Sequence, residues 1–127
     1  MATVLISSLI VTMINVMIIT AEAALDPLCG ASNEWFCSPT DFDHSDAQEQ
    51  VFPSLTLRAE CDPAYYNHGA QTAYAHSSCA HGPTCADCLY RATQIMREYC
   101  PGKDGAQYGN EECCARYEKN NFCGASE

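Results

Sequence analysis

Basic residues are scarce in this 127-residue sequence. Six Lys and Arg residues stand against sixteen Asp and Glu residues, which gives a formal net charge of −10 at pH 7. An acidic surface repels both the nucleic-acid backbone and anionic bilayers. The charge therefore excludes nucleic-acid partners and cationic membrane disruption, and it leaves specific binding as the route to any antimicrobial effect. The basic residues form no cluster; they are Arg58, Arg91, Arg97, Lys103, Arg116 and Lys119.

Large apolar residues are also scarce once the first two dozen residues are set aside. Residues 24–127 contain only eleven Leu, Ile, Val and Phe residues. So few aliphatic residues with a high net charge are typical of disorder. The same span nevertheless holds all ten cysteines, an even number that indicates a disulfide scaffold in an oxidising compartment. At about 2–4 kcal/mol each, such bridges take the place of the missing core.

The one long apolar run lies at the start of the chain. It covers residues 2–21 and leads into Ala21-Glu22-Ala23, a small-x-small cleavage signal. A transmembrane anchor is the alternative, although no basic stop-transfer flank follows Ile19. We predict a signal peptide over residues 1–23 and a single secreted, extracellular domain over 24–127, whose mature chain does not insert into membranes.

The clearest secondary-structure element is a helix from about Cys85 to Tyr99. Thr84 and Asp87 stand in a capping-box relation at its start, and Pro101-Gly102 ends it. Apolar residues recur within it at helical spacing, which predicts a buried stripe that carries two cysteines. The stripe consists of Cys85, Cys88, Leu89, Ala92, Ile95, Met96 and Tyr99.

Other elements are shorter. Residues 24–44 are rich in turn formers, residues 45–52 are expected to open a helix that Pro53 interrupts, and Leu55 and Leu57 are expected on an offset turn. Residues 71–78 alternate like a strand. Residues 106–108 and 113–118 are predicted to be strands joined by a Gly109-Asn110 turn.

Two adjacent cysteines lie on the last predicted strand. Because strand side chains alternate, Cys113 shares one face with Ala115 and Tyr117, whereas Cys114 lies on the other face. The two cysteines therefore serve different layers. One is expected to bridge to the helix, where Cys88 faces the core side, and the other must find a partner elsewhere.

The C-terminal half, about residues 72–122, carries cysteines and flanking residues at a specific spacing. They are Thr72-Ala73-Tyr74, Cys79, Cys85, Cys88, Cys100, Cys113 and Tyr117-Glu118. This spacing resembles the Gnk2-homologous (DUF26) domain, the plant cysteine-rich module of ginkbilobin-like antifungal proteins and receptor-kinase ectodomains. The eponymous C-x8-C-x2-C motif is shortened, because five residues instead of eight separate Cys79 from Cys85.

This resemblance implies an α+β fold, a small disulfide-stapled domain in which an antiparallel sheet packs against two helices. It also implies three disulfides, Cys37–Cys100, Cys79–Cys85 and Cys88–Cys113. Cys37 is preferred to Cys29 because its distance from the helix fits the family better. The four remaining cysteines leave three pairings open. Of these we favour Cys29–Cys61 with Cys114–Cys123, since each joins sequence neighbours.

Ginkbilobin-like members that bind mannose use an Asn, an Arg and a Glu. At the matching positions this sequence has Ser38, Gln107 and Glu118, so only the Glu is kept. A sugar's vicinal hydroxyls need a carboxylate acceptor and a fixed donor, and Ser and Gln supply hydrogen bonds without charge assistance. Mannose binding is therefore a hypothesis that the resemblance raises. The alternative is that Glu118 is a solvated strand residue.

Other chemistry is less well supported by the sequence. Cys85-Ala86-Asp87-Cys88 has redox-motif spacing, but no βαβ context surrounds it, and structural half-cystines are the better interpretation. A zinc site of Cys79, His81, Cys85 and Cys88 has suitable ligand types but conflicts with an oxidised cysteine set. Cys113-Cys114 lacks the His-Asp dyad of secreted phospholipases A2. We expect no metal, no cofactor and no enzymatic activity.

The resemblance implies a secreted plant defence protein of the apoplast, antifungal and able to bind mannose-type glycans such as those of fungal cell walls. The alternative is an apoplastic signalling module that binds a plant cell-surface receptor and no sugar. Kinase and transmembrane segments of the receptor relatives have no counterpart in residues 24–127, so we expect a free, soluble protein.

Overall fold

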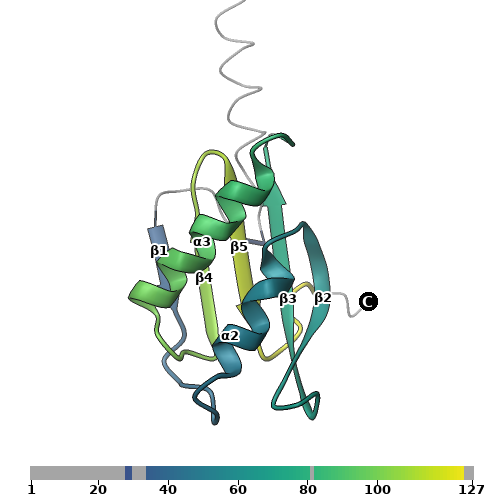
Figure 1. Cartoon of the computed structure of the whole chain (residues 1–127), viewed down its shortest axis with the longest axis vertical. Helices are drawn as coiled ribbons and strands as arrows, with labels where there is room; N and C mark the ends of the chain where they lie inside the picture. The colour runs from purple at the N-terminus through teal and green to yellow at the C-terminus, as the bar shows by residue number, and fades with distance from the viewer. Residues whose placement is uncertain (1–27, 30–33, 81, 125–127) are drawn as a thin grey trace, which may run out of the picture.

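Five antiparallel strands form one sheet, with the helices on one of its faces (Figure 1). The computed structural model describes residues 28–29, 34–80 and 82–124, so the predicted signal peptide lies outside the described residues. The sheet order is β1-β4-β5-β3-β2. The elements are β1 (Glu34–Cys37), α2 (Ala47–Val51), the 3-10 helix η1 (Phe52–Leu55), β2 (Ala59–Tyr66), β3 (Gln71–Cys79), α3 (Cys85–Tyr99), β4 (Gly105–Gly109) and β5 (Cys113–Glu118). This is the expected α+β fold.

Helix α3 has the bounds that the apolar spacing predicts. The middle of the predicted stripe is buried, with Leu89, Ala92 and Met96 fully covered. Its C-terminal residue, Tyr99, is instead 48% exposed. The predicted capping box does not form: Thr84 is the N-cap residue, but its side chain makes no cap hydrogen bond. The packing of the central stripe therefore stabilises this helix more than its cap does.

The second helical segment is short because Pro53 follows it. α2 ends at Val51 and continues as the 3-10 helix η1, in which Pro53 occupies a first-turn position where its missing N–H costs nothing. Val51 and Leu55 are buried against the sheet. Leu57 lies beyond η1 and is 71% exposed, so only the first of the two predicted leucines contributes to the core.

Two strands are absent from the sequence prediction, and both are edge strands. All four residues of β1 are exposed, so its sequence shows no burial alternation. β2 contains Pro63, which an edge strand tolerates. The ladder between β2 and β3 shifts register between Glu60 and Asp62, where Cys61 bulges out with a φ of 61°.

The two faces of the sheet differ in what covers them. The helix-side face holds the core, in which the rings of Phe42, Phe52, Tyr66 and Tyr117 pack together. The opposite face, called the outer face below, is covered by none of the helices of the described residues (Figure 1). In the described part of the chain no helix is both long and apolar enough to cross a membrane.

All ten cysteines are paired. The three pairs that the family resemblance implies are present: Cys37–Cys100, Cys79–Cys85 and Cys88–Cys113. Cys88–Cys113 joins α3 to the core side of β5, as the strand alternation predicts.

The favoured pairing of the other four cysteines is wrong. The structure has Cys29–Cys114 and Cys61–Cys123 in place of Cys29–Cys61 and Cys114–Cys123. Arg116 on β5 and Gln107 on β4 hold the carbonyls of Leu28 and Cys29, so Cys29 lies beside Cys114 on the outer face of β5. Cys61 lies on β2, two strands and so roughly 10 Å away from Cys114, which places it beyond the reach of Cys29. Each of these pairs joins two cysteines that meet on the outer face, and closeness in the sequence does not select them.

Candidate functional site

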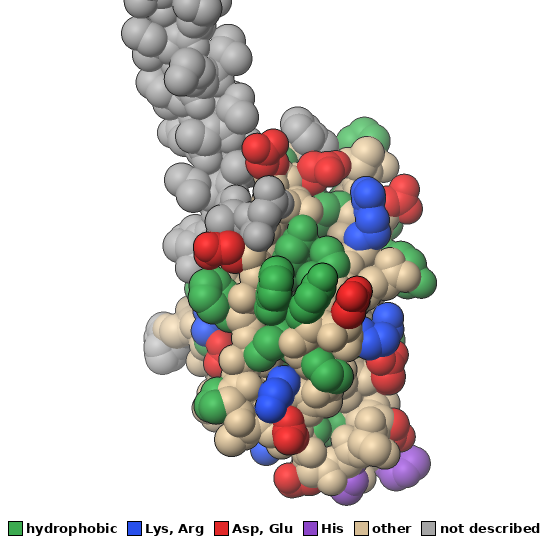
Figure 2. Space-filling view, turned by 90° about the vertical axis from the view of Figure 1, so that its left-hand side faces the viewer, with side chains coloured by type: hydrophobic (Ala, Val, Ile, Leu, Met, Phe, Trp, Pro, Cys, Tyr) green, Lys and Arg blue, Asp and Glu red, His purple; other side chains and the backbone are tan. Residues whose placement is uncertain are grey.

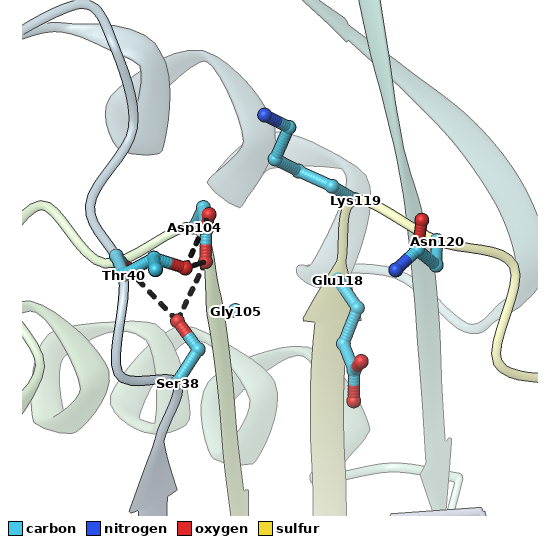
Figure 3. A pocket seen from close by; sticks show the side chains of 7 residues that line it. All are labelled: Ser38, Thr40, Asp104, Gly105, Glu118, Lys119 and Asn120. Carbon is cyan, nitrogen blue, oxygen red and sulfur yellow. Dashed lines mark hydrogen bonds between the residues drawn. The ribbon is translucent and has the colours of Figure 1, made fainter.

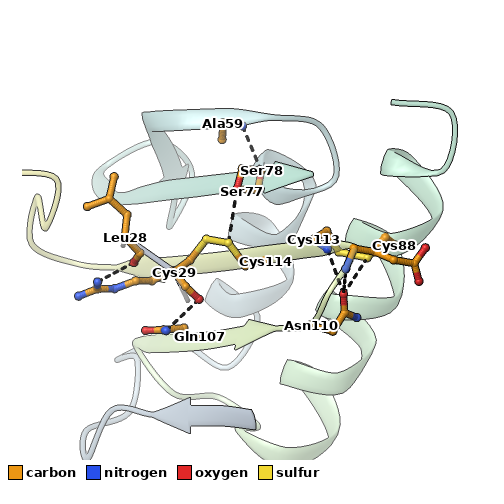
Figure 4. Close-up of a disulfide and its surroundings, with 12 residues drawn as sticks. Leu28, Cys29, Ala59, Ser77, Ser78, Cys88, Gln107, Asn110, Cys113 and Cys114 are labelled. Atoms are coloured by element: carbon orange, nitrogen blue, oxygen red, sulfur yellow. Dashed lines mark hydrogen bonds between the residues drawn. A yellow bond between two sulfur atoms is a disulfide. The ribbon is translucent and has the colours of Figure 1, made fainter. Parts of the chain in front are cut away.

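The outer face is overlaid by two short segments from opposite ends of the domain. Cys29 is held on β5 through its bond to Cys114 (Figure 4), and Cys123 is held on β2 through its bond to Cys61. These two disulfides are the ones that the family pattern does not include. They place Leu28–Cys29 and Phe122–Cys123 beside the polar side chains of β4 and β5.

Arg116 is the centre of this overlay. Its Nη1 donates a hydrogen bond of 2.8 Å to the carbonyl of Leu28, and its guanidinium lies 4.0 Å from the ring centroid of Phe122. Its Nε donates to Glu118 Oε2 at 2.6 Å, and its Nη2 pairs with the same oxygen. Among the described residues, Glu118 Oε1 has no bonding partner. The ion pair therefore fixes the carboxylate and leaves one oxygen available to a ligand.

Gln107 lies across the ladder from Arg116, on β4. Its Nε2 donates a hydrogen bond of 2.9 Å to the carbonyl of Cys29 (Figure 4). The Cys29–Cys114 disulfide thus positions the Gln107 amide through the backbone of Cys29. The side-chain oxygen of Gln107 has no partner among the described residues and can accept a hydrogen bond.

Ser38 follows β1 and belongs to a hydroxyl–carboxylate cluster (Figure 3). Its Oγ donates to Asp104 Oδ1 at 2.6 Å, and Thr40 Oγ1 lies 2.9 and 2.8 Å from the two carboxylate oxygens of Asp104. The Asp104 N–H donates to the Thr40 carbonyl at 3.0 Å. Ser38 is therefore held in place by Asp104, and its oxygen keeps acceptor capacity.

A buried network fixes the loop that carries Asp104. The Gln48 amide donates to the Cys100 carbonyl at 2.7 Å and to Tyr117 Oη at 2.9 Å, and it accepts from the Gly102 N–H at 3.0 Å. The Tyr117 hydroxyl donates to the Lys103 carbonyl at 2.6 Å. Burial raises the pKa of Tyr117 well above its usual range, so its hydroxyl stays protonated as a donor.

A cavity of about 340 Å³ opens between these groups. Its floor is Gly105, where an added Cβ would lie 3.4 Å from Ser38 Cβ and 3.4 Å from Glu118 Cγ. Figure 3 shows Ser38 and Glu118 on opposite sides of this glycine. The φ of Gly105 is not positive, so its backbone does not require a glycine. The missing side chain is what keeps the floor open. The cavity is lined by Ser38, Thr40, Asp104, Gly105, Glu118, Lys119 and Asn120.

An adjoining cavity of about 260 Å³ shares Ser38, Gly105 and Glu118 and adds Gln107. The structure therefore brings all three predicted site residues together around one opening. The set offers a fixed carboxylate oxygen, an amide oxygen and a hydroxyl oxygen on rigid strands, with the Lys119 ammonium at the rim. Such a set can receive the hydroxyl groups of a sugar.

Thr40, Asp104 and Gly105 are among the contributors to the site that the sequence reasoning missed. Thr40 and Asp104 lie in segments with no periodicity, and they meet only because the chain brings residues 38–40 beside 103–105. Gly105 gives no signal in a sequence that has seven glycines. Turn residues next to predicted strand ends are the one clue that could have pointed to them.

The alternative chemistries do not fit the described residues. Cys85 and Cys88 bond to Cys79 and Cys113 and not to each other, so their C-x-x-C spacing forms no redox pair. The same bonds consume the sulfurs of the considered zinc set, whose His81 lies outside the described residues. Cys61, Cys123 and His76 also converge, but the disulfide already uses both sulfurs. A separate cavity of about 440 Å³ over β2 and β3 contains none of the predicted site residues.

Neither a family model nor a curated protein matches this sequence. Solved structures do match, and two of them are tandem DUF26 ectodomains. One is the tandem DUF26 ectodomain of the cysteine-rich receptor-like protein PDLP8 from Arabidopsis thaliana, with a TM-score of 0.61 and 17% identity over 76% of this chain. The other is the tandem DUF26 ectodomain of PDLP5 from the same plant, with a TM-score of 0.58 and 21% identity over 72%.

The chain has the DUF26 fold. It spans 52% of the length of each of these tandem ectodomains. This is the fold that the cysteine spacing indicated, although the connection between Cys79 and Cys85 is shorter than in the family motif. The Cys29–Cys114 and Cys61–Cys123 disulfides lie on the outer face of this sheet, and the first of them holds the backbone carbonyl to which Gln107 donates.

Proposed function

We propose that this chain is a secreted plant defence protein, without enzymatic activity, that binds mannose-type glycans in the apoplast and acts against fungi through that binding. The single observation that carries the proposal is the convergence of Ser38, Gln107 and Glu118 around one glycine-floored opening. These residues come from three separate segments, and the family resemblance selects them independently of the structure. Secretion agrees with the ten paired cysteines, which require an oxidising compartment.

Glu118 is the principal residue in this proposal. A hydrogen bond between a carboxylate and a sugar hydroxyl is worth about 1.5–3 kcal/mol, so Glu118→Ala is expected to weaken mannose binding roughly ten- to a hundredfold. Calorimetric titration of the purified protein measures this effect. Glu112→Ala is the matched control, because Glu112 is an exposed acid that lies just before β5, at the end of the strand opposite Glu118. Equal mannose affinity of the native protein and Glu118→Ala would remove Glu118 from the site.

A gain-of-function pair tests the same site in the opposite direction. Ser38→Asn with Gln107→Arg restores the amide and the charged donor of the mannose-binding pattern. An arginine at position 107 can still donate to the Cys29 carbonyl while its remaining N–H groups face the opening. We expect this double variant to bind mannose more tightly than the native protein. Unchanged mannose affinity would show that the opening does not use these positions.

An aromatic pair on another side of the molecule favours a second candidate function. Trp35 and Tyr99 stack with their ring centroids 4.3 Å apart and are 44% and 48% exposed. Figure 2 looks onto the side of the molecule that carries β1, where hydrophobic side chains gather. Exposed aromatic clusters are typical of protein-binding surfaces. The alternative function is therefore receptor binding in apoplastic signalling, with no sugar ligand.

The two functions differ in which variant loses binding. Receptor binding predicts no glycan affinity in the native protein, retained partner binding in Glu118→Ala and its loss in Trp35→Ala. Glycan binding predicts that mannose affinity is lost in Glu118→Ala and retained in Trp35→Ala. Capture of plant cell-surface ectodomains and titration with mannose, both measured with the two variants, separate them.

A further inference from the structure

An aromatic residue also lines the opening described above, and it is not one of the three positions of the mannose-binding pattern. The cavity of about 260 Å³ is lined by Phe36 in addition to Ser38, Gln107 and Glu118. Phe36 pairs with Gln107 in the ladder between β1 and β4. Residues paired in this way present their side chains on the same face of a sheet. Phe36 and Gln107 therefore border the same part of the outer face.

The neighbouring strand residue supports this orientation. Trp35 stacks on Tyr99 of α3, so its side chain lies on the helix side of the sheet. Because side chains alternate along a strand, that of Phe36 lies on the outer face. Phe36 is 58% exposed, so the core does not account for an aromatic ring at this position. None of the other exposed aromatic residues lines either cavity of the site.

We propose that Phe36 is the stacking platform of a second sugar subsite, so that the ligand of this site is an oligosaccharide and not a single sugar. The inference rests on the proposed glycan binding and names its ligand class. One face of a pyranose ring presents C–H groups, which pack on the electron-rich face of an aromatic ring. The Gly105 floor beside Glu118 receives one sugar through its hydroxyls, and Phe36 receives the apolar face of the next.

The spacing of the strands sets the length of this ligand. Phe36 is on β1 and Glu118 is on β5, with β4 between them, so the two lie roughly 10 Å apart across the sheet. The cavity of about 260 Å³ is lined by both Phe36 and Glu118, so two linked sugars can occupy the space between these groups. The two cavities meet at Ser38, Gly105 and Glu118, which gives a continuous path between the subsites.

The test compares mannose with α-linked mannobiose and mannotriose in calorimetric titrations of the purified native protein, Phe36→Ala and Tyr65→Ala. Tyr65 is the matched control, since it is an equally exposed aromatic residue, 59%, on the opposite edge strand. Native protein is expected to bind mannotriose about three- to tenfold more tightly than mannose, the gain that one aromatic contact provides. Phe36→Ala is expected to lose this gain and keep the affinity for mannose itself. Tyr65→Ala is expected to behave as the native protein does.

Each outcome decides a separate point. Equal affinity of the native protein for all three sugars overturns the second subsite and leaves the mannose site standing. A gain with chain length that survives in Phe36→Ala overturns the role of Phe36. Failure of the native protein to bind any of the three sugars overturns the proposed function itself, and the second subsite with it. Because Phe36 is exposed, the melting temperature of Phe36→Ala should match that of the native protein.

Discussion

Removing the Cys88–Cys113 bridge is expected to destabilise the domain more than removing Cys79–Cys85. The chain-entropy relation gives about 3.5 kcal/mol for a sequence separation of 25 and about 2.2 kcal/mol for a separation of 6. The first figure is an upper bound, because Cys37–Cys100 and Cys29–Cys114 already tether the same segments in the unfolded chain. Allowing for that tether lowers the entropic part to about 3 kcal/mol.

Burial increases the difference between the two bridges. Cys88 and Cys113 are 3% and 4% exposed and pack in the core, so Cys88→Ala with Cys113→Ala also loses core contacts. Cys79 and Cys85 are only partly buried. At roughly 4–8 °C per kcal/mol, the Cys88/Cys113 double variant should melt at least 12 °C below the native protein.

Urea unfolding without reductant, followed by circular dichroism, measures both double variants. The reasoning is refuted if Cys79→Ala with Cys85→Ala is the less stable of the two. It is also refuted if the Cys88/Cys113 variant unfolds at the native urea midpoint, because the helix-to-sheet disulfide would then not replace the missing apolar core.

Three further predictions concern the core and the cysteines. Leu89→Ala is expected to lower the free energy of unfolding in urea by about 2–5 kcal/mol, because Leu89 is a fully buried residue of α3. A smaller loss would mean that the core closes around the cavity. Because folding raises the pKa of Tyr117, the contribution of this tyrosine to stability is complete below about pH 10 and is lost as the pH rises further. The urea midpoint of the native protein should therefore fall as the pH is raised above about 10. Tyr117→Phe should show a smaller fall. Thiol titration of the native protein should find no free thiol, since all ten cysteines are paired, and a reactive pair would revive the redox interpretation.

Elements with a strong local pattern could be predicted from the sequence. The limits of α3 follow from the apolar spacing before Pro101-Gly102, and β5 follows from alternation that also separates Cys113 from Cys114. The edge strands could not be predicted, because β1 is exposed throughout and β2 contains a proline, Pro63, which argues locally against a strand. Their formation depends on partners far away in the sequence, which a local pattern does not record.

The same distinction applies to the disulfides and the site. Pairs that join α3 to the sheet could be placed from the family spacing, whereas Cys29–Cys114 and Cys61–Cys123 depend on which strands the terminal segments cross. Ser38, Gln107 and Glu118 could be named from the resemblance. The opening they surround could not, because it depends on a glycine that lies between them only after the sheet has formed.

The central claim is that a glycan binds on the outer face around Gly105, and amide chemical-shift mapping of the purified protein during titration with mannotriose tests it most directly. The account predicts shifts concentrated at residues 36–40, 104–107 and 116–120. Gly105→Ala adds a methyl group 3.4 Å from both Ser38 Cβ and Glu118 Cγ, which narrows the floor of the opening, and it should reduce these shifts while amides remote from the site keep their native positions. Shifts centred instead on the cavity beside Arg58 and His76, or no shifts at saturating sugar, would contradict the claim.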